Sequence, residues 1–150
     1  MSQSLAKIYV HAIFSTKNRM ACLSPGLCQE LYPYTATVLQ NLDCPPIQIG
    51  GVVDHIHILC ALSKNLSIKE FIAEIKKPTS KWVKTKDAIF RNFFWQGGYG
   101  AFSVSQSQVE RVRAYIIGQT EHHRKQTFQD EFRAFLRKYK IPFDERYVWD

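Results

Sequence analysis

The chain of 150 residues is long enough for one domain with one hydrophobic core, and its hydrophobic content of 45% is that of a folded globular protein. Twenty Lys and Arg residues against thirteen Asp and Glu residues give a net charge of +7, which favours a polyanionic partner such as nucleic acid. No apolar run reaches the roughly 18 residues that span a bilayer, and the first residues do not have the pattern of a signal peptide. We therefore expect one domain over residues 1–150 in a cytoplasmic protein.

The four cysteines do not have the spacing of a zinc site or a disulfide framework. They stand in apolar or turn-like surroundings without a C-x-x-C pair, at Cys22, Cys28, Cys44 and Cys60. We expect them to be reduced and structural, as is usual in a cytoplasmic protein.

The first half of the chain predicts a strand, a helix and a hairpin. Residues 7–15 are rich in strand formers. The apolar spacing between residues 27 and 42 predicts a helix, which Pro33 should kink or delay. Two further strand-like runs, residues 47–53 and 55–62, are separated by a short connection and should form an antiparallel hairpin.

The next segment predicts a helix and two short strands. Ser67 followed by Glu70 has the pattern of a capping box and precedes an apolar helical stripe. Pro78 should kink or end that helix. Residues 93–95 and 101–105 are strand-like runs on either side of a glycine-rich connection.

The remaining residues predict two helices. Ser107 with Glu110 is a second capping-box pattern, which opens a helix to about Arg124, and the aromatic spacing over residues 128–139 predicts a last amphipathic helix. The whole order fits an α+β fold of the ferredoxin-like (RRM-like) type. It is a split β-α-β antiparallel sheet with helices packed on one face and an additional C-terminal helix that bears Tyr115. Such a sheet would leave one face free for a ligand.

The run His55-Ile56-His57 carries the first chemical signal. Because strand side chains alternate, both histidines point to one face and Ile56 points to the other. Two imidazoles on the same side can bind one metal ion. A half-exposed strand also carries histidines that are only solvated or hydrogen-bonded, so this run alone leaves both interpretations open.

The helix expected after Ser107 carries the second signal. Tyr115 and Gln119 are four residues apart and therefore share one helix face, which His122 continues. An isolated tyrosine at the edge of an amphipathic helix is more often structural than catalytic, so the helix alone does not assign a function.

The two motifs together resemble the HUH-class single-tyrosine transposases, the small enzymes of single-strand insertion sequences. The signature of that family is a His-hydrophobe-His strand and a helix with Tyr-x-x-x-Gln, which stand here as His55-Ile56-His57 and Tyr115-x-x-x-Gln119. Residues 11–19 and 95–104 are also similar to the family, so the resemblance extends from about residue 5 to about residue 132.

The resemblance implies that Tyr115 attacks single-stranded DNA, giving a covalent 5′-phosphotyrosine and a free 3′-hydroxyl for later rejoining. It also implies that His55, His57 and Gln119 bind Mg²⁺ or Mn²⁺, between which the sequence does not choose. His122 is a candidate for assisting the tyrosine or contacting phosphate, although a surface histidine is the simpler interpretation. No proton acceptor for Tyr115 can be identified.

The resemblance further implies a homodimer that binds hairpin-containing ends of a DNA element. In similar transposases the tyrosine-bearing helix of one subunit can complete the metal site of the other, and the polar residues 105–108 with Gly118 would permit such movement. Basic side chains near the expected site or after the second helix are candidates for phosphate contacts, namely Lys17, Arg19, Lys76, Lys77, Lys81, Arg111 and Arg113.

Three other functions remain compatible with the sequence. A domesticated or repeat-associated relative would use the same chemistry without a mobile element of its own. A metal-dependent phosphoesterase would use His55 and His57 with activated water and form no covalent product. A non-catalytic single-strand nucleic-acid-binding module would explain the charge and the sheet, but not the presence of Tyr115 and Gln119.

Overall fold

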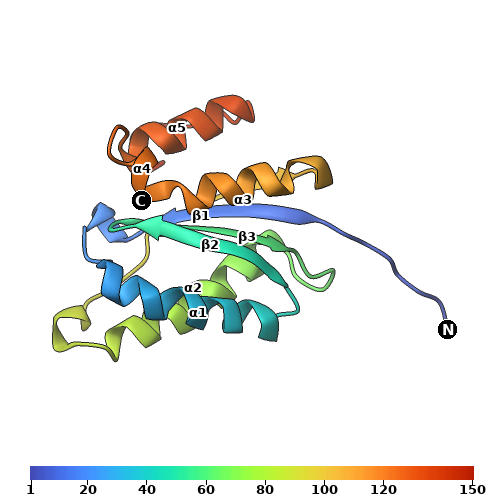
Figure 1. Ribbon diagram of the computed structural model, residues 1–150, viewed down its shortest axis with the longest axis horizontal. Coiled ribbons are helices and arrows are strands. Elements are labelled where there is room, and N and C mark those ends of the chain that lie inside the picture. Colours follow the sequence, from blue (N-terminus) through green and yellow to red (C-terminus); the bar gives the residue numbers. More distant parts are fainter.

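A computed structural model describes all residues from Met1 to Asp150 as an antiparallel sheet with helices on both faces (Figure 1). The strands are β1 (Tyr9–Ser15), β2 (Pro46–Val52), β3 (His55–Ala61) and β4 (Gly100–Val104), in the spatial order β2-β3-β1-β4. Every neighbouring pair is antiparallel. Together with the chain order β-α-β-β-α-β, this arrangement confirms the predicted ferredoxin-like α+β fold.

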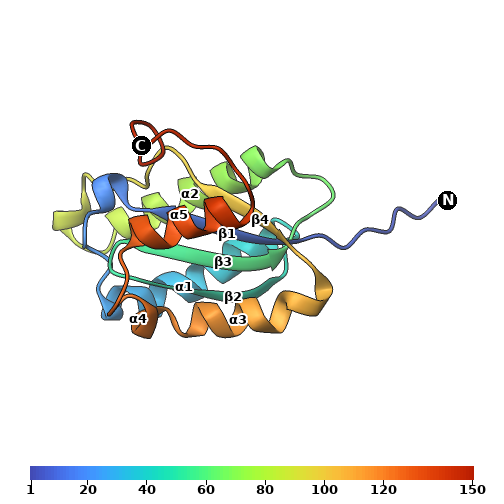
Figure 2. The same cartoon turned by 90° about the horizontal axis from the view of Figure 1, so that it is seen from above.

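The helices form two layers (Figures 1 and 2). Helices α1 (Pro25–Asn41) and α2 (Ile68–Lys84) cover one face of the sheet, as predicted. The C-terminal helices lie over the other face, and they are α3 (Val109–Ile117), α4 (Gln119–His122) and α5 (Phe128–Lys138). The face that was expected to be open is therefore covered. No helix has the length and apolar character that crossing a bilayer requires.

The main core lies between the sheet and the α1–α2 layer. Strand alternation sends Ile56, Ile58 and Cys60 of β3 into it, beside Phe14 of β1, all of them at most 1% exposed. This cluster contains 18 buried residues, which makes it the largest apolar region of the molecule. All four cysteines are free thiols, and three of them are buried, in agreement with the prediction of structural cysteines.

The C-terminal layer is attached by two smaller apolar clusters. Phe128 and Phe132 of α5 pack on Ile13, and Ile116 of α3 packs on Leu59. Helix α3 approaches β2 closely at Gly50, where an added Cβ would lie 2.8 Å from the Ile116 side chain and 2.9 Å from its carbonyl oxygen. Two separate attachments thus hold this layer, and polar residues lie between them.

Pro33 does not delay the start of its helix and Pro78 does not end its helix, since both lie inside continuous helices. Helix α1 begins at Pro25, well ahead of Pro33, and α2 continues through Pro78 to Lys84. Pro33 is exposed and Pro78 is half-exposed, so water can satisfy the carbonyl groups that lose their helical partners. Ser67 caps α2 as predicted, because its hydroxyl accepts a hydrogen bond from the amide of Glu70.

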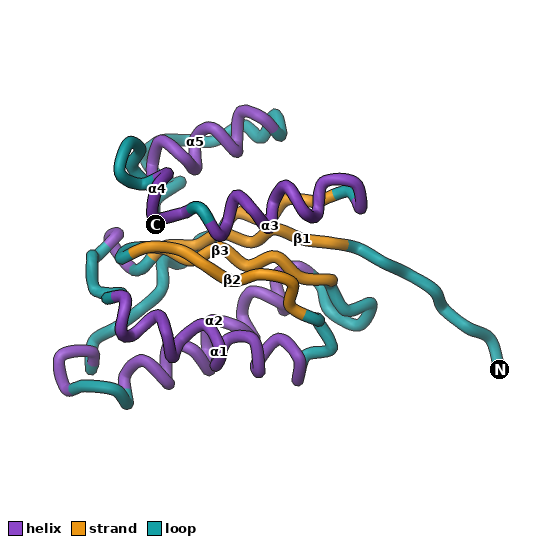
Figure 3. Tube along the Cα trace, in the orientation of Figure 1, coloured by secondary structure: helices purple, strands orange, loops and turns teal.

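Three local predictions were wrong. Ser107 does not cap α3, since its hydroxyl contacts Ser105 within the 3-10 turn η3 (Gln106–Gln108). The expected helix to Arg124 is interrupted at Gly118, where α3 ends before α4 begins. Residues 93–95 form no strand, only an isolated bridge between Thr16 and Trp95. Figure 3 shows the long connection from α2 to β4 in which this bridge lies, and the segment before β1 that extends away from the body.

Candidate active site

The two histidines of the His-Ile-His run lie side by side on β3, beneath the C-terminal layer. His55 and His57 are 0% exposed, and their ring centroids are 5.1 Å apart. In the sheet register His57 stands between Ile13 of β1 and Gly50 of β2. The predicted alternation is therefore present, but both imidazoles are buried against residues of α3, α4 and α5 and are not on an open sheet face.

His55 is oriented by the preceding residue. Its Nδ1 donates to the Asp54 carboxylate at 2.7 Å, and its Nε2 faces the Oε1 atom of Gln119 at 3.1 Å. Burial alone would disfavour the charged ring, but hydrogen bonds with Asp54 and Glu131 raise the pKa of His55 to about 9. The surroundings of His55 therefore favour a positive charge at its Nε2 atom.

His57 is oriented from β1. Its Nδ1 lies 2.8 Å from Nε2 of His11, and its own Nε2 lies 3.0 Å from Glu131. Burial lowers the pKa of His57, and burial together with His57 lowers the pKa of His11 well below its usual value. Both rings are therefore neutral at physiological pH, and a neutral His11 can accept a hydrogen bond from Nδ1 of His57.

Tyr115 and Gln119 reach the same centre from the interrupted helix. The ring of Tyr115 lies 5.9 Å from that of His57, and Gln119 is only 1% exposed. Burial and the neighbouring Glu131 carboxylate, to which the phenol donates, raise the pKa of Tyr115 above its usual value. His122 stacks on the Tyr115 ring with centroids 4.5 Å apart and is not among the polar groups that meet at His55.

Four residues of this centre were missed by the sequence analysis, namely His11, Asp54, His123 and Glu131. A signal for the last one exists, because Glu131 stands between Phe128 and Phe132 on the apolar stripe of α5, where a solvated carboxylate does not belong. It is 1% exposed and touches His55, His57 and Tyr115. Contacts across so many residues of sequence could not be read from local spacing.

The atoms that face one another in this centre fit a divalent cation. Nδ1 of His55 keeps its proton, because the Asp54 carboxylate can only accept, so Nε2 is the atom that would bind an ion, which must displace the proton held there. Gln119 donates its Nε2 to Glu131 at 2.9 Å, which leaves its Oε1 facing His55. Two acceptors this close need a cation or a proton between them, and imidazole nitrogen with neutral oxygen is a suitable ligand pair.

A cavity of about 830 Å³ opens onto Tyr115 between α3 and α5. Its wall includes Arg111 and Lys138, one from each helix, as well as the ring of Phe135. A space of this size is typical of sites that enclose a ligand. The buried polar centre is therefore connected to solvent beside its tyrosine.

The predicted phosphate-binding residues do not form one surface. Arg111 lines the cavity beside Tyr115, whereas Lys77 and Lys81 lie on α2, on the opposite side of the sheet. The ammonium of Lys76 donates to the carbonyl groups of residues 96 and 98 at 2.7 Å each, and burial lowers its pKa to about 8.

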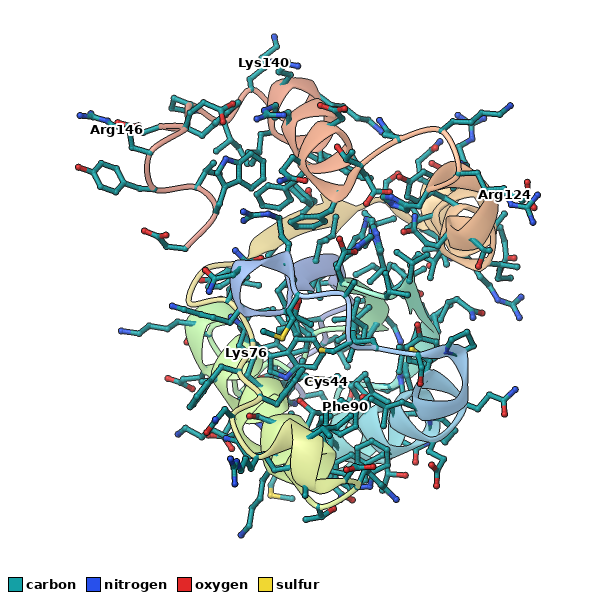
Figure 4. All side chains as sticks on the ribbon, turned by 90° about the vertical axis from the view of Figure 1, so that its left-hand side faces the viewer. Cys44, Lys76, Phe90, Arg124, Lys140 and Arg146 are labelled. Carbon is teal, nitrogen blue, oxygen red and sulfur yellow. The ribbon has the colours of Figure 1, made fainter.

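The remaining three members of that set also lie apart from the cavity. Lys17 and Arg19 belong to the 3-10 turn η1 (Lys17–Arg19) after β1. Arg113 pairs with Glu110 on the surface of α3. Figure 4 shows Lys76 against the body of the molecule, while Arg124 projects outward.

The comparison with protein families decides the class of this protein. The family described as "Transposase IS200 like" matches residues 4–119. The chain belongs to this family. The matched segment contains His55, His57, Tyr115 and Gln119, and it ends before His123 and Glu131. No curated protein sequence matches the chain.

Two solved structures share the fold. A candidate transposase from Deinococcus radiodurans R1 is 18% identical, with a TM-score of 0.62 over 79% of this chain and 98% of that one. A REP-associated tyrosine transposase, solved bound to a REP hairpin, is 17% identical, with a TM-score of 0.59 over 82% of this chain and 74% of that one. The IS200-like transposase thus has a transposase fold as well as the family sequence.

Proposed function

We propose that this transposase cleaves and rejoins single-stranded DNA, with Tyr115 as the nucleophile and with Mg²⁺ or Mn²⁺ bound by His55, His57 and Gln119. The convergence of the Tyr115 hydroxyl and two buried imidazoles from a distant segment carries the proposal. A purely structural role would not require the tyrosine to share a buried polar centre that opens into a cavity. Membership of the IS200-like family supports the same reaction.

In the cleavage step the phenolic oxygen of Tyr115 forms a bond to phosphorus while the bond from phosphorus to the 3′-oxygen breaks. The phenol gives up its proton, the departing 3′-oxygen gains one, and the DNA remains attached as a 5′-phosphotyrosine. Rejoining is the reverse exchange, in which a 3′-hydroxyl displaces the tyrosine. The covalent link conserves the phosphodiester energy, so no external energy source is needed. A divalent ion, when bound, supplies charge stabilisation at the phosphate.

Neighbouring residues orient the two imidazoles for metal binding. Asp54 fixes the ring of His55, and His11 contacts the far nitrogen of His57. Outer hydrogen bonds of this kind set the tautomer and orientation of histidine ligands. The raised pKa of Tyr115 keeps the phenol protonated until substrate and ion are in place.

The cavity between α3 and α5 is the proposed entry for the DNA strand. Arg111 and Lys138 offer positive charge on its two walls, and Phe135 offers an aromatic face for an unpaired base. One similar structure was solved with a REP hairpin, which supports a hairpin-containing element end as the substrate here. A DNA-acting enzyme of this kind works in the cytoplasm, in association with the nucleoid when DNA is bound.

A homodimer with sites shared between subunits remains our hypothesis. In this structure Tyr115 lies beside His57 of its own chain, so one chain is sufficient to assemble the residues. Mixing a His57→Ala chain with a Tyr115→Phe chain tests the exchange, because recovered activity requires that one subunit supplies the tyrosine to the other.

Incubation with labelled single-stranded DNA that carries element ends, in the presence of Mn²⁺, tests the proposed reaction. We expect a covalent protein–DNA adduct on a denaturing gel, and none with Tyr115→Phe. Tyr147→Phe is the matched control, because Tyr147 is 64% exposed in the C-terminal segment, and its adduct should equal that of the wild type.

The same gel separates the alternatives. Cleavage that persists in Tyr115→Phe without any adduct would favour a phosphoesterase that uses activated water. Binding of the cognate DNA without cleavage would favour a non-catalytic module. Either result would contradict the role proposed for Tyr115.

A further inference from the structure

Glu131 is the most completely enclosed carboxylate at the site. It is 1% exposed, although it belongs to α5 and lies outside the segment that matches the family. Its Oε1 lies 3.0 Å from Nε2 of His57 and 3.3 Å from Nε2 of His55. A carboxylate buried this deeply needs partners, and no Lys or Arg contacts it, so its partners are imidazoles, the Tyr115 hydroxyl and the amide of Gln119.

The hydrogen bonds around Glu131 show which imidazole nitrogens are directed at it. His123 donates through Nδ1 to the carbonyl oxygen of Gln126 at 2.7 Å, because a carbonyl can only accept. Its Nε2 is therefore a lone pair in the neutral ring, and this buried atom has no hydrogen-bond partner. It nevertheless lies 3.2 Å from Oε2 of Glu131. His55 repeats the pattern, with Nδ1 bound to Asp54 and Nε2 directed at Glu131.

The spacing of these atoms suits one shared ion. One ligand atom each from His55, His57, His123 and Glu131 lies within 4.8 Å of the others. An ion that binds two neighbouring ligands at right angles, at about 2.1 Å from each, separates them by about 3 Å. The two contacts from Oε1 of Glu131 to the imidazoles of β3 are close to this value. A carboxylate also adds the negative charge that Mg²⁺ and Mn²⁺ prefer in a ligand set.

We propose that Glu131 is a further ligand of the metal ion and that it also positions the nucleophile. Its Oε1 would bind the ion together with His55 and His57, while its Oε2 accepts hydrogen bonds from the Tyr115 hydroxyl and from Nε2 of Gln119. One side chain thereby joins the ion to the tyrosine. The proposal rests on the metal-dependent function argued above and adds α5 to the catalytic centre.

Helix α5 is built to hold this carboxylate in place. The hydroxyl of Thr127 caps its first turn by accepting from the amide of Asp130 at 3.2 Å. Phe128 and Phe132, on either side of Glu131 along the same stripe, are 2% and 3% exposed. The backbone that carries Glu131 is therefore anchored by apolar contacts on both sides.

Metal binding by the full-length protein tests the proposal without DNA. Free Mn²⁺ is counted by electron paramagnetic resonance, and Co²⁺ absorption reports the ligand set. We expect Glu131→Gln, which keeps the shape of the side chain, to weaken Mn²⁺ binding at least about tenfold and to change the Co²⁺ spectrum. Asp130→Asn is the matched control on the exposed side of α5 and should bind as the wild type does.

Two further variants separate the outcomes. His57→Ala should lose Mn²⁺ binding, and a wild-type protein that binds neither ion would overturn the metal-dependent function itself. If His57→Ala loses binding while Glu131→Gln binds Mn²⁺ as tightly as the wild type, or more tightly, the role of Glu131 is overturned and the function stands. Glu131→Asp serves if the glutamine variant is poorly folded. Because it retains a carboxylate, its Mn²⁺ affinity and Co²⁺ spectrum should lie between those of Glu131→Gln and the wild type.

Discussion

The two faces of the sheet have the same backbone but opposite chemistry. On the α1–α2 side, β3 contributes Ile56 and Ile58 to a cluster of 18 buried residues. On the α3–α5 side, the same strand contributes His55 and His57 to a buried polar centre. Two apolar clusters of five and four buried residues flank that centre.

The difference between the faces separates stability from reactivity. The first face buries apolar surface continuously, which is the main source of folding free energy. On the second face much of the buried surface belongs to polar groups that need a cation. Only the two smaller apolar clusters attach the C-terminal helices there. Changes on the first face should therefore alter the free energy of unfolding, and changes on the second should alter metal binding and strand cleavage.

The largest effect is expected from His57→Ala on the polar face. Loss of the imidazole that contacts both His11 and Glu131 should weaken Mn²⁺ binding by at least about 100-fold and abolish adduct formation. Titration calorimetry measures the affinity, and circular dichroism checks the fold. His122→Ala is the control, because His122 stacks on Tyr115 without joining the ligand cluster. Equal affinity in both variants would contradict the assignment of His57.

Ile58→Ala makes the corresponding change on the apolar face. Ile58 is 0% exposed, so its truncation should lower the free energy of unfolding by about 3 kcal/mol in urea denaturation. The folded variant should still bind Mn²⁺ nearly as the wild type does. Ile117→Ala, at a position 63% exposed on α3, should cost less than about 0.5 kcal/mol. A loss of metal affinity as large as in His57→Ala would show that the two faces are not independent.

The pH dependence of metal binding sharpens the comparison further. Because the pKa of His55 is about 9 in the metal-free protein, the ion must displace a proton. Mn²⁺ affinity should therefore rise about tenfold per pH unit up to about pH 9 and then level off. Calorimetry under argon at several pH values measures this slope. Asp54→Asn removes a group that raises the pKa, so its plateau should begin at lower pH, and a flat profile in the wild type would exclude the protonated His55.

The same titration of His55 should lower the stability of the metal-free protein as the pH rises, whereas it raises the metal affinity. The pKa of His55 in the folded protein lies above the ordinary histidine value of about 6.5, so protonation stabilises the fold fully below about pH 6.5. This contribution is lost as the pH rises toward 9. Urea denaturation in the presence of a chelator should show that decline, and Asp54→Asn should reduce it.

The smallest effect is expected at Gly50 of β2, which α3 approaches closely. An Ala side chain at Gly50 would collide with the backbone and side chain of Ile116, so Gly50→Ala should cost about 1–3 kcal/mol and slow adduct formation by displacing α3. Gly26→Ala is the control, because a Cβ there meets nothing within 4 Å. Equal unfolding midpoints for the two variants would contradict a close approach of α3 to β2.

Much of the fold followed from local patterns in the sequence. Strand alternation and helical stripes predicted the order of elements, and Ser67 marked the start of α2 correctly. Pro33 did not delay the start of α1 and Pro78 did not end α2, because a proline on an exposed or half-exposed helix face leaves its unpaired carbonyls to water. Ser107 misled because its capping pattern competes with a hydroxyl contact to Ser105.

The site was less accessible to sequence reasoning. His55, His57, Tyr115 and Gln119 were found through motif spacing and family resemblance, and the structure brings all four together. Glu131 was missed because its partners on β3 are distant in sequence and its helix was interpreted only as an apolar stripe. Tertiary packing, which no local pattern encodes, placed the carboxylate on the imidazoles.

The alternation of His and Ile along β3 also has a consequence for how the chain reaches its native state. A slip of one residue in the pairing of β3 would turn His55 and His57 into the apolar cluster and expose Ile56 and Ile58. Both halves of that exchange are unfavourable, because imidazoles would lose their hydrogen bonds while apolar surface returned to water. The residues proposed for catalysis therefore also discriminate against misregistered sheets during folding.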